Sequence, residues 1–351
     1  MDDSILAMFP DDDHVLGPFL GNLPPEILDA VVQKLGWFQT TFAMAGRTCR
    51  EAVERVPSTR AVLTEKERKQ FRPRQMTPLA DAVVKGDVEA LQWLIQLFDA
   101  KGLEWRSTYD GTELSGLAAK RGKLESLKCL RANGCPWDWN TCWKAAEGGR
   151  LEVLQWARQN GCPWNRKTCE WAARGGHLEM LQWARQNGCP WDKWTCEVAA
   201  SGGHLEVLQW ARQNGCPWDK WTCSWAANRG DLEMLQWARQ NGCPWNERTC
   251  EWAARGGHLE VLQWARENGC PWDKETCSWA AKGGHLEVLQ WARENGCPWD
   301  EWTCMYAASG GHLEVLQWAH ENGCPWDVWT WRHASSKCRP YLREHGCPGA
   351  E

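Results

Sequence analysis

The sequence predicts an all-α protein, a helical solenoid built from about ten short helix pairs. Three observations point to this fold class. A strict 27-residue period runs through most of the chain, glycines divide each period into two short segments, and the second segment carries an apolar stripe at helical spacing. One period is too small to bury its own stripe, so neighbouring units must stack to form a continuous core.

The period is clearest in two short motifs that recur without a break. Leu-Gln-Trp keeps the same step from Leu154 to Leu316. A fixed period of this length is the signature of a repeat architecture and outweighs any interpretation made element by element. The tetrapeptide Gly-Cys-Pro-Trp starts at Gly134, Gly161, Gly188, Gly215, Gly242, Gly269, Gly296 and Gly323.

Each unit is expected to contain two helices, as in the unit that runs from Thr168 to Trp194. The first helix spans roughly Thr168 to Arg174, and Asn165 stands where a short polar side chain can cap free amides. A glycine pair ends it. The second helix begins near His177, and Gly188 stops it.

The repeated motifs resemble ankyrin repeats. Gly-His-Leu-Glu-Val-Leu at residues 203–208, followed by Asn-Gly-Cys at 214–216, is similar to the ankyrin helix and its glycine corner. Thr-Cys-x-x-Ala-Ala stands where ankyrin repeats carry Thr-Pro-Leu-His. The period here is shorter than the usual length of about 33 residues, so the resemblance implies that the β-hairpin fingers are reduced to short loops.

The two ends of the array depart from the strict period. Residues 77–79 and 85–89 are close to the ordinary ankyrin form, and Asp110-Gly111-Thr112 resembles its hairpin. A degenerate unit at 330–348 is expected to cap the solenoid, with Arg339 where the preceding unit has a leucine.

The segment before the repeats has a different composition. Leu-Pro-Pro-Glu-Ile-Leu at 23–28, followed by an apolar pattern, resembles the first helix of an F-box. F-box heads joined to Trp-rich and Cys-rich ankyrin variants also resemble proteins of giant DNA viruses and some algae. The alternative is a helical cap that only seals the first repeat. The resemblance implies docking on the Skp-type adaptor of a cullin-RING ubiquitin ligase through Leu23, Pro24, Ile27, Leu28, Val31 and Leu35.

These patterns divide the chain into segments of different character. The tail is acidic, the linker is charged, and the longest segment is periodic. The expected segments are an acidic N-terminal tail at 1–18, an F-box-like helical domain at 19–58, a charged linker at 59–76 and the ankyrin-like solenoid at 77–348.

Composition and charge exclude several classes of protein. The chain has 40 Lys and Arg against 45 Asp and Glu, a formal net charge of -5, which disfavours a broadly basic nucleic-acid-binding domain. No apolar stretch is long enough for a membrane span, and the acidic start is unlike a secretory signal. We therefore expect an intracellular protein of the cytoplasm or nucleus, in a host cell if the protein is viral, with no membrane partner.

The recurring cysteines and histidines do not have the spacing of a metal site. Cys162 and Cys169 are separated by six residues, whereas structural zinc sites use closer pairs, so the 19 cysteines are expected to be free thiols packed as small buried residues. The histidines typified by His177 recur without a ligand partner and are assigned to turn hydrogen bonds. No metal and no cofactor is predicted. No catalytic motif appears at a meaningful spacing, so an enzyme is not expected.

Tryptophan recurs at two invariant positions, typified by Trp183 and Trp191, and at a third, variable one, typified by Trp171. The invariant pair is interpreted as core, because an indole buries a large area. A base-stacking platform for single-stranded nucleic acid is a remote alternative.

The positions that vary from unit to unit predict where a partner binds. Scaffold residues are constrained by the period, and residues that vary are free to serve recognition. By the ankyrin resemblance, loops and first helices line the concave side, so these residues are expected to form one stripe that binds a target protein. A plain scaffold without ligase contact is the alternative function. The loop residues are Asn140, Lys167, Trp194, Trp221, Arg248, Glu275, Trp302 and Trp329, and the first-helix residues are Trp143, Glu170, Glu197, Ser224, Glu251, Ser278 and Met305.

Overall fold

The computed structural model describes residues 78–100 and 108–350, and the regular structure in these ranges is entirely helical. Clustering of contacts divides the chain into two compact units, Met1–Thr141 and Cys142–Glu351. The F-box-like head and the charged linker lie outside the described residues. None of the described helices is long and apolar enough to cross a membrane.

The described part of the first unit contains two helix pairs, with Leu114, Ala118 and Ala119 among the buried residues. The hairpin expected at 110–112 is wrong, since these residues are helical. The helix at 108–121 contains one glycine in this stretch, which costs only about 1 kcal/mol. This helix packs on two others of its unit, at 78–85 and 124–132. The helices are α6 (Pro78–Lys85), α7 (Val88–Ala100), α8 (Thr108–Arg121) and α9 (Leu124–Ala132).

The second unit continues the same alternation of first and second helices, and α10 (Trp139–Glu147) crosses the boundary between the units. The described residues thus form the ten helix pairs that the sequence predicted. The other helices are α11 (Leu151–Gln159), α12 (Arg166–Arg174), α13 (Leu178–Gln186), α14 (Lys193–Gly202), α15 (Leu205–Gln213), α16 (Lys220–Arg229), α17 (Leu232–Gln240), α18 (Glu247–Gly256), α19 (Leu259–Glu267), α20 (Lys274–Gly283), α21 (Leu286–Glu294), α22 (Glu301–Gly310), α23 (Leu313–Glu321), α24 (Val328–His333) and α25 (Arg339–Glu344).

The helix ends follow from local sequence. The side chain of Asn165 accepts a hydrogen bond from the backbone N–H of Lys167 at 3.0 Å and so caps α12. At the end of α13, the N–H of Gly188 bonds to the carbonyl of Arg185 and the N–H of Cys189 to that of Ala184, at 3.0 and 2.9 Å. This is a Schellman ending, which requires the positive φ of 81° found at the glycine.

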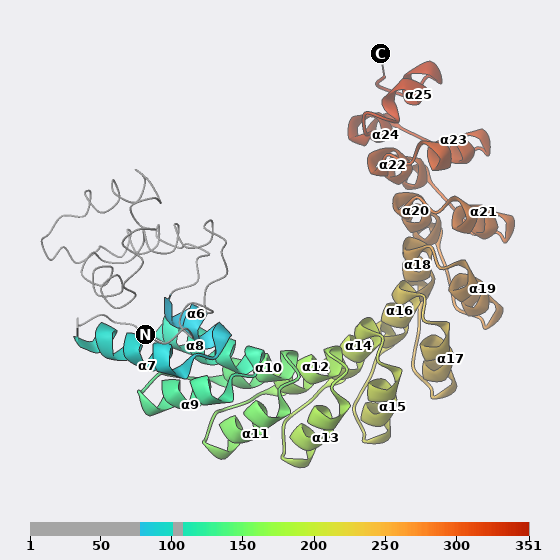
Figure 1. The fold of residues 1–351 in the computed structure, drawn as a ribbon. Helices are drawn as coiled ribbons and strands as arrows, with labels where there is room; N and C mark the ends of the chain where they lie inside the picture. Colours follow the sequence, from blue (N-terminus) through green and yellow to red (C-terminus); the bar gives the residue numbers. More distant parts are fainter. Residues whose placement is uncertain (1–77, 101–107, 351) are drawn as a thin grey trace, which may run out of the picture. The chain divides into compact units, whose positions relative to one another are not determined.

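Two rows of helices form the second unit (Figure 1). The first helices, with even labels, pack directly on one another along the concave side, whereas the second helices, with odd labels, stand apart on the convex side. The first helices approach closely because small side chains line their contacts: Thr195, Cys196, Ala199 and Ala200 are all fully buried. Close packing on one side and wider spacing on the other curves this array.

The invariant tryptophans occupy the wider side, and the sequence interpretation of them as core is corrected here. Trp191 and Trp210 are half-buried and meet edge to face, with ring centroids 5.8 Å apart. The guanidinium of Arg185 lies 4.1 Å from the ring of Trp191 and donates a hydrogen bond to the Cys189 carbonyl. These large side chains lie between neighbouring second helices, hold them apart and contact one another.

The cysteine ladders are part of the core, as predicted. Cys169, Cys189 and Cys196 are fully buried, and the thiol of Cys189 donates a hydrogen bond to the carbonyl of Asn165 in the preceding loop at 3.5 Å. Hydrogen bonding to Cys216 and burial both raise the pKa of the Cys196 thiol, which favours the protonated form. Among the described residues, no group of three His, Cys, Asp or Glu side chains is placed to hold a metal ion.

The histidine ladder joins consecutive units. Nε2 of His258 donates a hydrogen bond to the carbonyl of Asn228, and Nε2 of His285 to that of Arg255, each at 3.0 Å. These carbonyls end first helices and have no partner within the helix. The histidines do serve in hydrogen bonds at the turns, but the acceptors lie 30 residues back, so these bonds connect a second helix to the first helix of the unit before.

The unit of α16 and α17 is one of those that depart from the histidine pattern, and it compensates for the change. Asp231 replaces the histidine and caps α17 by accepting a hydrogen bond from the N–H of Met234 at 2.9 Å. The carbonyl that a histidine would bind, that of Ser201, instead accepts a hydrogen bond from the guanidinium of Arg229 at 3.1 Å. The two departures from the repeat therefore act together to keep the bond between units.

We expect Gly257→Ala to destabilise the protein more than Gly269→Ala does. Both glycines have positive φ, 75° and 80°, so each alanine costs about 1 kcal/mol of backbone strain. A Cβ at Gly257 would also lie 2.6 Å from the His285 ring, whereas none of the described atoms lies within 4 Å of a Cβ at Gly269. The additional loss should be about 1 to 3 kcal/mol in urea unfolding.

The double variant Gly257→Ala with His285→Ala provides the control. Removing the imidazole should abolish the additional cost of the alanine, at the expense of the hydrogen bond to Arg255. Equal losses for Gly257→Ala and Gly269→Ala would show that the histidine and the glycine do not constrain each other.

Candidate protein-interaction surface

The loop residues proposed for target binding lie at the starts of the first helices. Three of them are the exposed large hydrophobic side chains of the described chain: Trp194 is 48% exposed, Trp302 44% and Trp329 50%. Arg248 and Lys167 are exposed as well. Asn140, Trp221 and Glu275 are half-buried. This set therefore offers indole and cationic groups to solvent in several consecutive units.

The first-helix residues proposed for target binding are mostly buried, and this part of the expectation is corrected. Their side chains point toward the next first helix, as shown by the hydroxyl groups of Ser278 and Thr303, which lie 3.3 Å apart. A partner on the concave side cannot reach such positions. Trp143 and Glu170 are half-buried, and the buried members are Glu197, Ser224, Glu251, Ser278 and Met305.

The accessible residues of the first helices each stand one position after the buried ones, as Trp252 follows Glu251. This accessible face combines the loop position with residues four and seven positions later, such as Arg248, Trp252 and Arg255, which share one face of α18. We call these side chains the concave stripe. Their members in α12 to α22 are Lys167, Trp171, Arg174, Trp194, Val198, Ser201, Trp221, Trp225, Asn228, Arg248, Trp252, Arg255, Glu275, Trp279, Lys282, Trp302, Tyr306 and Ser309.

Sequence reasoning missed two thirds of the concave stripe, although a signal was present. The residues that align with Trp171 and Arg174 also change from unit to unit, as the third tryptophan position already indicated. Their spacing of four and seven residues from the variable loop position is the spacing of one helix face. Testing variable positions for helical spacing would have found them.

Aromatic rings connect the concave stripe between units. Trp252 meets Trp225 edge to face at 4.5 Å and Trp221 at 5.9 Å. Further along, Trp279 stacks on Tyr306 with ring centroids 5.9 Å apart. The rings of α16 and α18, and those of α20 and α22, therefore form two contiguous aromatic clusters.

Cationic groups lie on these rings. The guanidinium of Arg255 is 4.8 Å from the ring of Trp279, and Nζ of Lys282 is 4.7 Å from the same ring and 4.9 Å from that of Tyr306. Arg248 lies 4.9 Å from the ring of Trp221. These three cations are exposed, and the ion pairs of the described chain do not include them.

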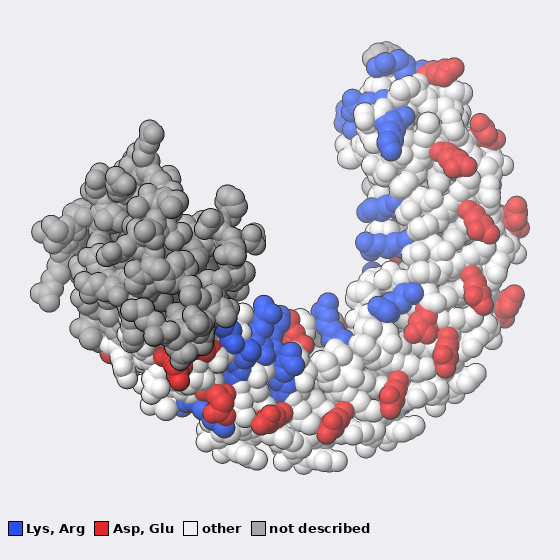
Figure 2. All heavy atoms as spheres, viewed as in Figure 1, with Lys and Arg blue, Asp and Glu red and all other residues white. Residues whose placement is uncertain are grey.

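Charge is segregated between the two faces of the second unit (Figure 2). Lys and Arg gather along its concave side, whereas Asp and Glu follow its convex side. The convex acids include Glu206, Glu260 and Glu314, which are exposed in the first turns of second helices. A carboxylate in that position is favoured by the helix dipole. The concave side therefore attracts negative charge although the whole chain carries a net charge of -5.

Buried acids contribute less negative charge to the concave side than their number suggests. Burial and the negative charge of Asp219 raise the pKa of Glu197 to about 7. Burial and the charge of Asp273 do the same for Glu251, also to about 7. Near neutral pH each of these carboxyls is partly protonated, because the charged form is poorly solvated between two first helices.

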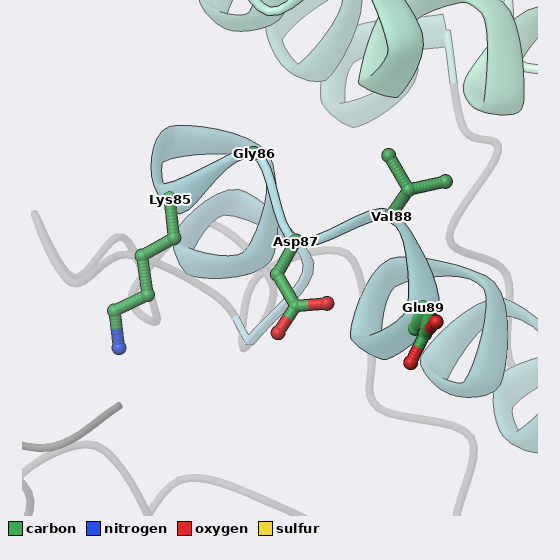
Figure 3. Close-up of a pocket in the computed structure, with 5 residues that line it drawn as sticks. All are labelled: Lys85, Gly86, Asp87, Val88 and Glu89. Carbon is green, nitrogen blue, oxygen red and sulfur yellow. The ribbon is translucent and has the colours of Figure 1, made fainter. Parts of the chain in front are cut away.

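A pocket of about 580 Å³ lies in the first unit at the turn from α6 to α7 (Figure 3). The polar groups of Lys85 and Asp87 serve the adjoining helices: Lys85 pairs with Asp81 at 2.9 Å, and Asp87 accepts a hydrogen bond from the N–H of Ala90 at 2.9 Å. Val88 points away from the Asp87 carboxylate. The lining residues thus do not converge on a position for a reacting group.

The architecture and surface define a repeat protein whose constant scaffold displays a variable binding face. Comparison with known families gives the type of repeat. Residues 142–185, 169–212, 223–266 and 277–320 match the family model described as ankyrin repeats (many copies). These segments of the chain are therefore similar to ankyrin repeats, a repeat type that typically serves as a non-enzymatic scaffold for protein-protein interaction.

Solved structures give a further comparison. The human ASB11 ankyrin repeat domain has 16% sequence identity to this chain, with a TM-score of 0.38, and the match covers 45% of this chain and 84% of that domain. A search of curated proteins found no match.

We expect Glu197→Gln to change how stability depends on pH. The Glu197 pKa is higher in the folded protein than in the unfolded chain, so its contribution is complete below the usual glutamate pKa and is lost as pH rises through about 7. The variant should be more stable than the wild type by about 1 to 3 kcal/mol near pH 8. The two should converge toward about pH 5, as measured by urea unfolding. Parallel pH profiles would contradict the assignment.

Proposed function

We propose that this chain is a substrate-recruiting adaptor of an SCF-type cullin-RING ubiquitin ligase. The F-box-like head at 19–58 would bind the Skp-type adaptor, and the ankyrin repeats would bind the protein to be ubiquitinated. The concave stripe carries the target-binding half of this proposal, because it presents variable, exposed side chains on a constant scaffold.

The ligase-binding half rests on the sequence of the head. Leu23, Pro24, Ile27 and Leu28 give an apolar face of the kind that an F-box helix docks on its adaptor, with Val31 and Leu35 continuing it. The order of head, charged linker and recognition solenoid is usual for such adaptors. If the head is only a helical cap, the protein is an ankyrin scaffold without ligase contact, and binding of the Skp-type adaptor distinguishes the two functions.

The target-binding set is revised to the side chains that a partner can reach. Trp194, Trp302 and Trp329 supply large exposed rings, and Arg248 supplies a guanidinium that lies on an indole. Trp and Arg are the residue types that dominate binding energy in protein interfaces. The buried first-helix residues act instead in packing between units.

We expect Leu23→Ala with Ile27→Ala to abolish co-purification of a Skp-type adaptor with the full-length chain. Both side chains belong to the proposed apolar face, and their truncation removes the area that drives docking. The measurement is pull-down of recombinant adaptor, with helicity followed by circular dichroism. Unaltered binding by the double variant, or none by the wild type, would rule out the ligase function.

We expect Trp194→Ala with Trp302→Ala to weaken target binding by about 2 kcal/mol or more, the scale of an interface hot spot. Because these indoles are about half exposed, stability should change little. Affinity purification of the tagged full-length chain, with quantitative comparison of the retained proteins, gives the measurement.

The matched control for the tryptophan variant is Glu206→Ala with Glu314→Ala. These residues lie in the same two repeat units but on the exposed convex side. Proteins that the wild type captures should remain with this control and be lost from the tryptophan variant. Equal capture by all three proteins would exclude the concave side as the interface, and unfolding of the tryptophan variant would show that the indoles are core.

A further inference from the structure

We propose that the concave stripe of α18 to α22 binds a linear acidic peptide segment, whose carboxylates pair with Arg248, Arg255 and Lys282. This inference rests on the proposed role of the repeats in target binding and specifies the chemistry of the target. It commits to one class of partner, a protein segment rich in Asp and Glu.

The cations of the stripe are arranged to receive carboxylates. Arg255 and Lys282 come from consecutive units, and both lie on the Trp279 ring. A guanidinium or ammonium group that is supported by a ring has less freedom to lose on binding, and its N–H donors at the edge remain available. The row of cations runs along the packed first helices, so a linear segment can contact several units.

The fold itself does not require positive charge at these positions. Equivalent positions in other units carry Ser201 and Ser309, which are compatible with the same helix ending. The carbonyls of Arg255 and Lys282 are already bound by His285 and His312, at 3.0 and 3.1 Å. The helix dipole favours a cation in the last turn by less than about 1 kcal/mol at an exposed site.

Two of the acidic side chains near the stripe cap helices, and a third is buried. Asp300 caps α22 by accepting a hydrogen bond from the N–H of Trp302 at 3.2 Å and pairs with Lys274 at 2.7 Å. Asp273 caps α20 in the same way. Glu251 is buried, and its raised pKa leaves it partly neutral. Glu275 is the carboxylate that belongs to this part of the stripe itself; it is half-buried, and burial and the charge of Asp273 raise its pKa. Arg248, Arg255 and Lys282 remain exposed to solvent.

Nucleic acid fits this face less well than an acidic peptide. Single-stranded nucleic acid binds when bases stack on open aromatic faces. At Trp279 and Tyr306, cations already lie over the rings, and the two rings stack on each other. At these two rings the stripe thus offers charge where base stacking would require an uncovered face, and the exposed indole of Trp302 is a ring left open to stacking.

The test uses the full-length protein and a fluorescein-labelled peptide of about sixteen residues that alternates Glu and Ser, with binding measured by anisotropy at low and at physiological salt. The wild type should bind the peptide, and salt should weaken the complex. Arg255→Ser with Lys282→Ser should bind at least about tenfold more weakly, because two charge-assisted contacts are lost. Serine is already present at equivalent positions, so the variant should fold.

Two further variants make the test specific. Lys128→Ser with Lys220→Ser removes the same charge elsewhere on the described surface and should bind within about twofold of the wild type. Ser201→Arg with Ser309→Lys extends the row of cations and should tighten binding by about threefold or more. Circular dichroism and thermal unfolding confirm that each variant is folded.

Several outcomes would overturn the proposal: no salt-dependent peptide binding by the wild type, equal losses in the two serine variants, or tighter binding of a single-stranded thymidine homopolymer than of the peptide. The last result would assign the stripe to nucleic acid. If the peptide does not bind while the tryptophan variant still loses captured proteins, only the acidic chemistry of the partner is wrong, and target binding by the repeats remains supported.

Discussion

The close packing of first helices on one another is the constraint on which the other features of the second unit depend. It is possible only because the contact positions carry small side chains, such as Cys196, Ala199 and Ala200, with Thr195 beside them. The second helices are held further apart by paired indoles and the arginines that lie on them. Tight packing on one side and bulk on the other make the array curve, and the curvature places the first helices on the concave side.

Polar contacts between units make this packing specific. A helix leaves carbonyls without partners at its end, and in first helices such as α16 and α18 a histidine from the following unit binds one of them. Where Asp231 interrupts the histidine series, Arg229 restores the contact from a neighbouring position. The glycines beside the histidines provide the space for the imidazole. The glycine turn, the histidine ring and the carbonyl that it binds therefore depend on one another.

The composition of the concave stripe follows from the same packing of first helices. Residues between first helices must be small or neutral, and even the acids among them have raised pKa values. Residues one position further along the helix are free of this requirement and vary between tryptophan, tyrosine and valine. The stripe residues three positions later vary between arginine, lysine, serine and asparagine. A surface that varies on a constant scaffold is what recognition of a particular protein partner needs.

The sequence by itself determined the period, the helix pairs, their caps and the buried thiols, because each depends on local chemistry repeated in every unit. It also predicted a variable binding face, and the F-box-like head remains a prediction from resemblance. Only the tertiary structure showed that Glu251 is buried between first helices whereas the adjacent Trp252 lies on the concave stripe. Adjacent helical residues differ by about 100° around the axis, so which of them meets the next helix is decided by how units stack. That angle of stacking depends on contacts from several units at once, and a single repeat contains none of them.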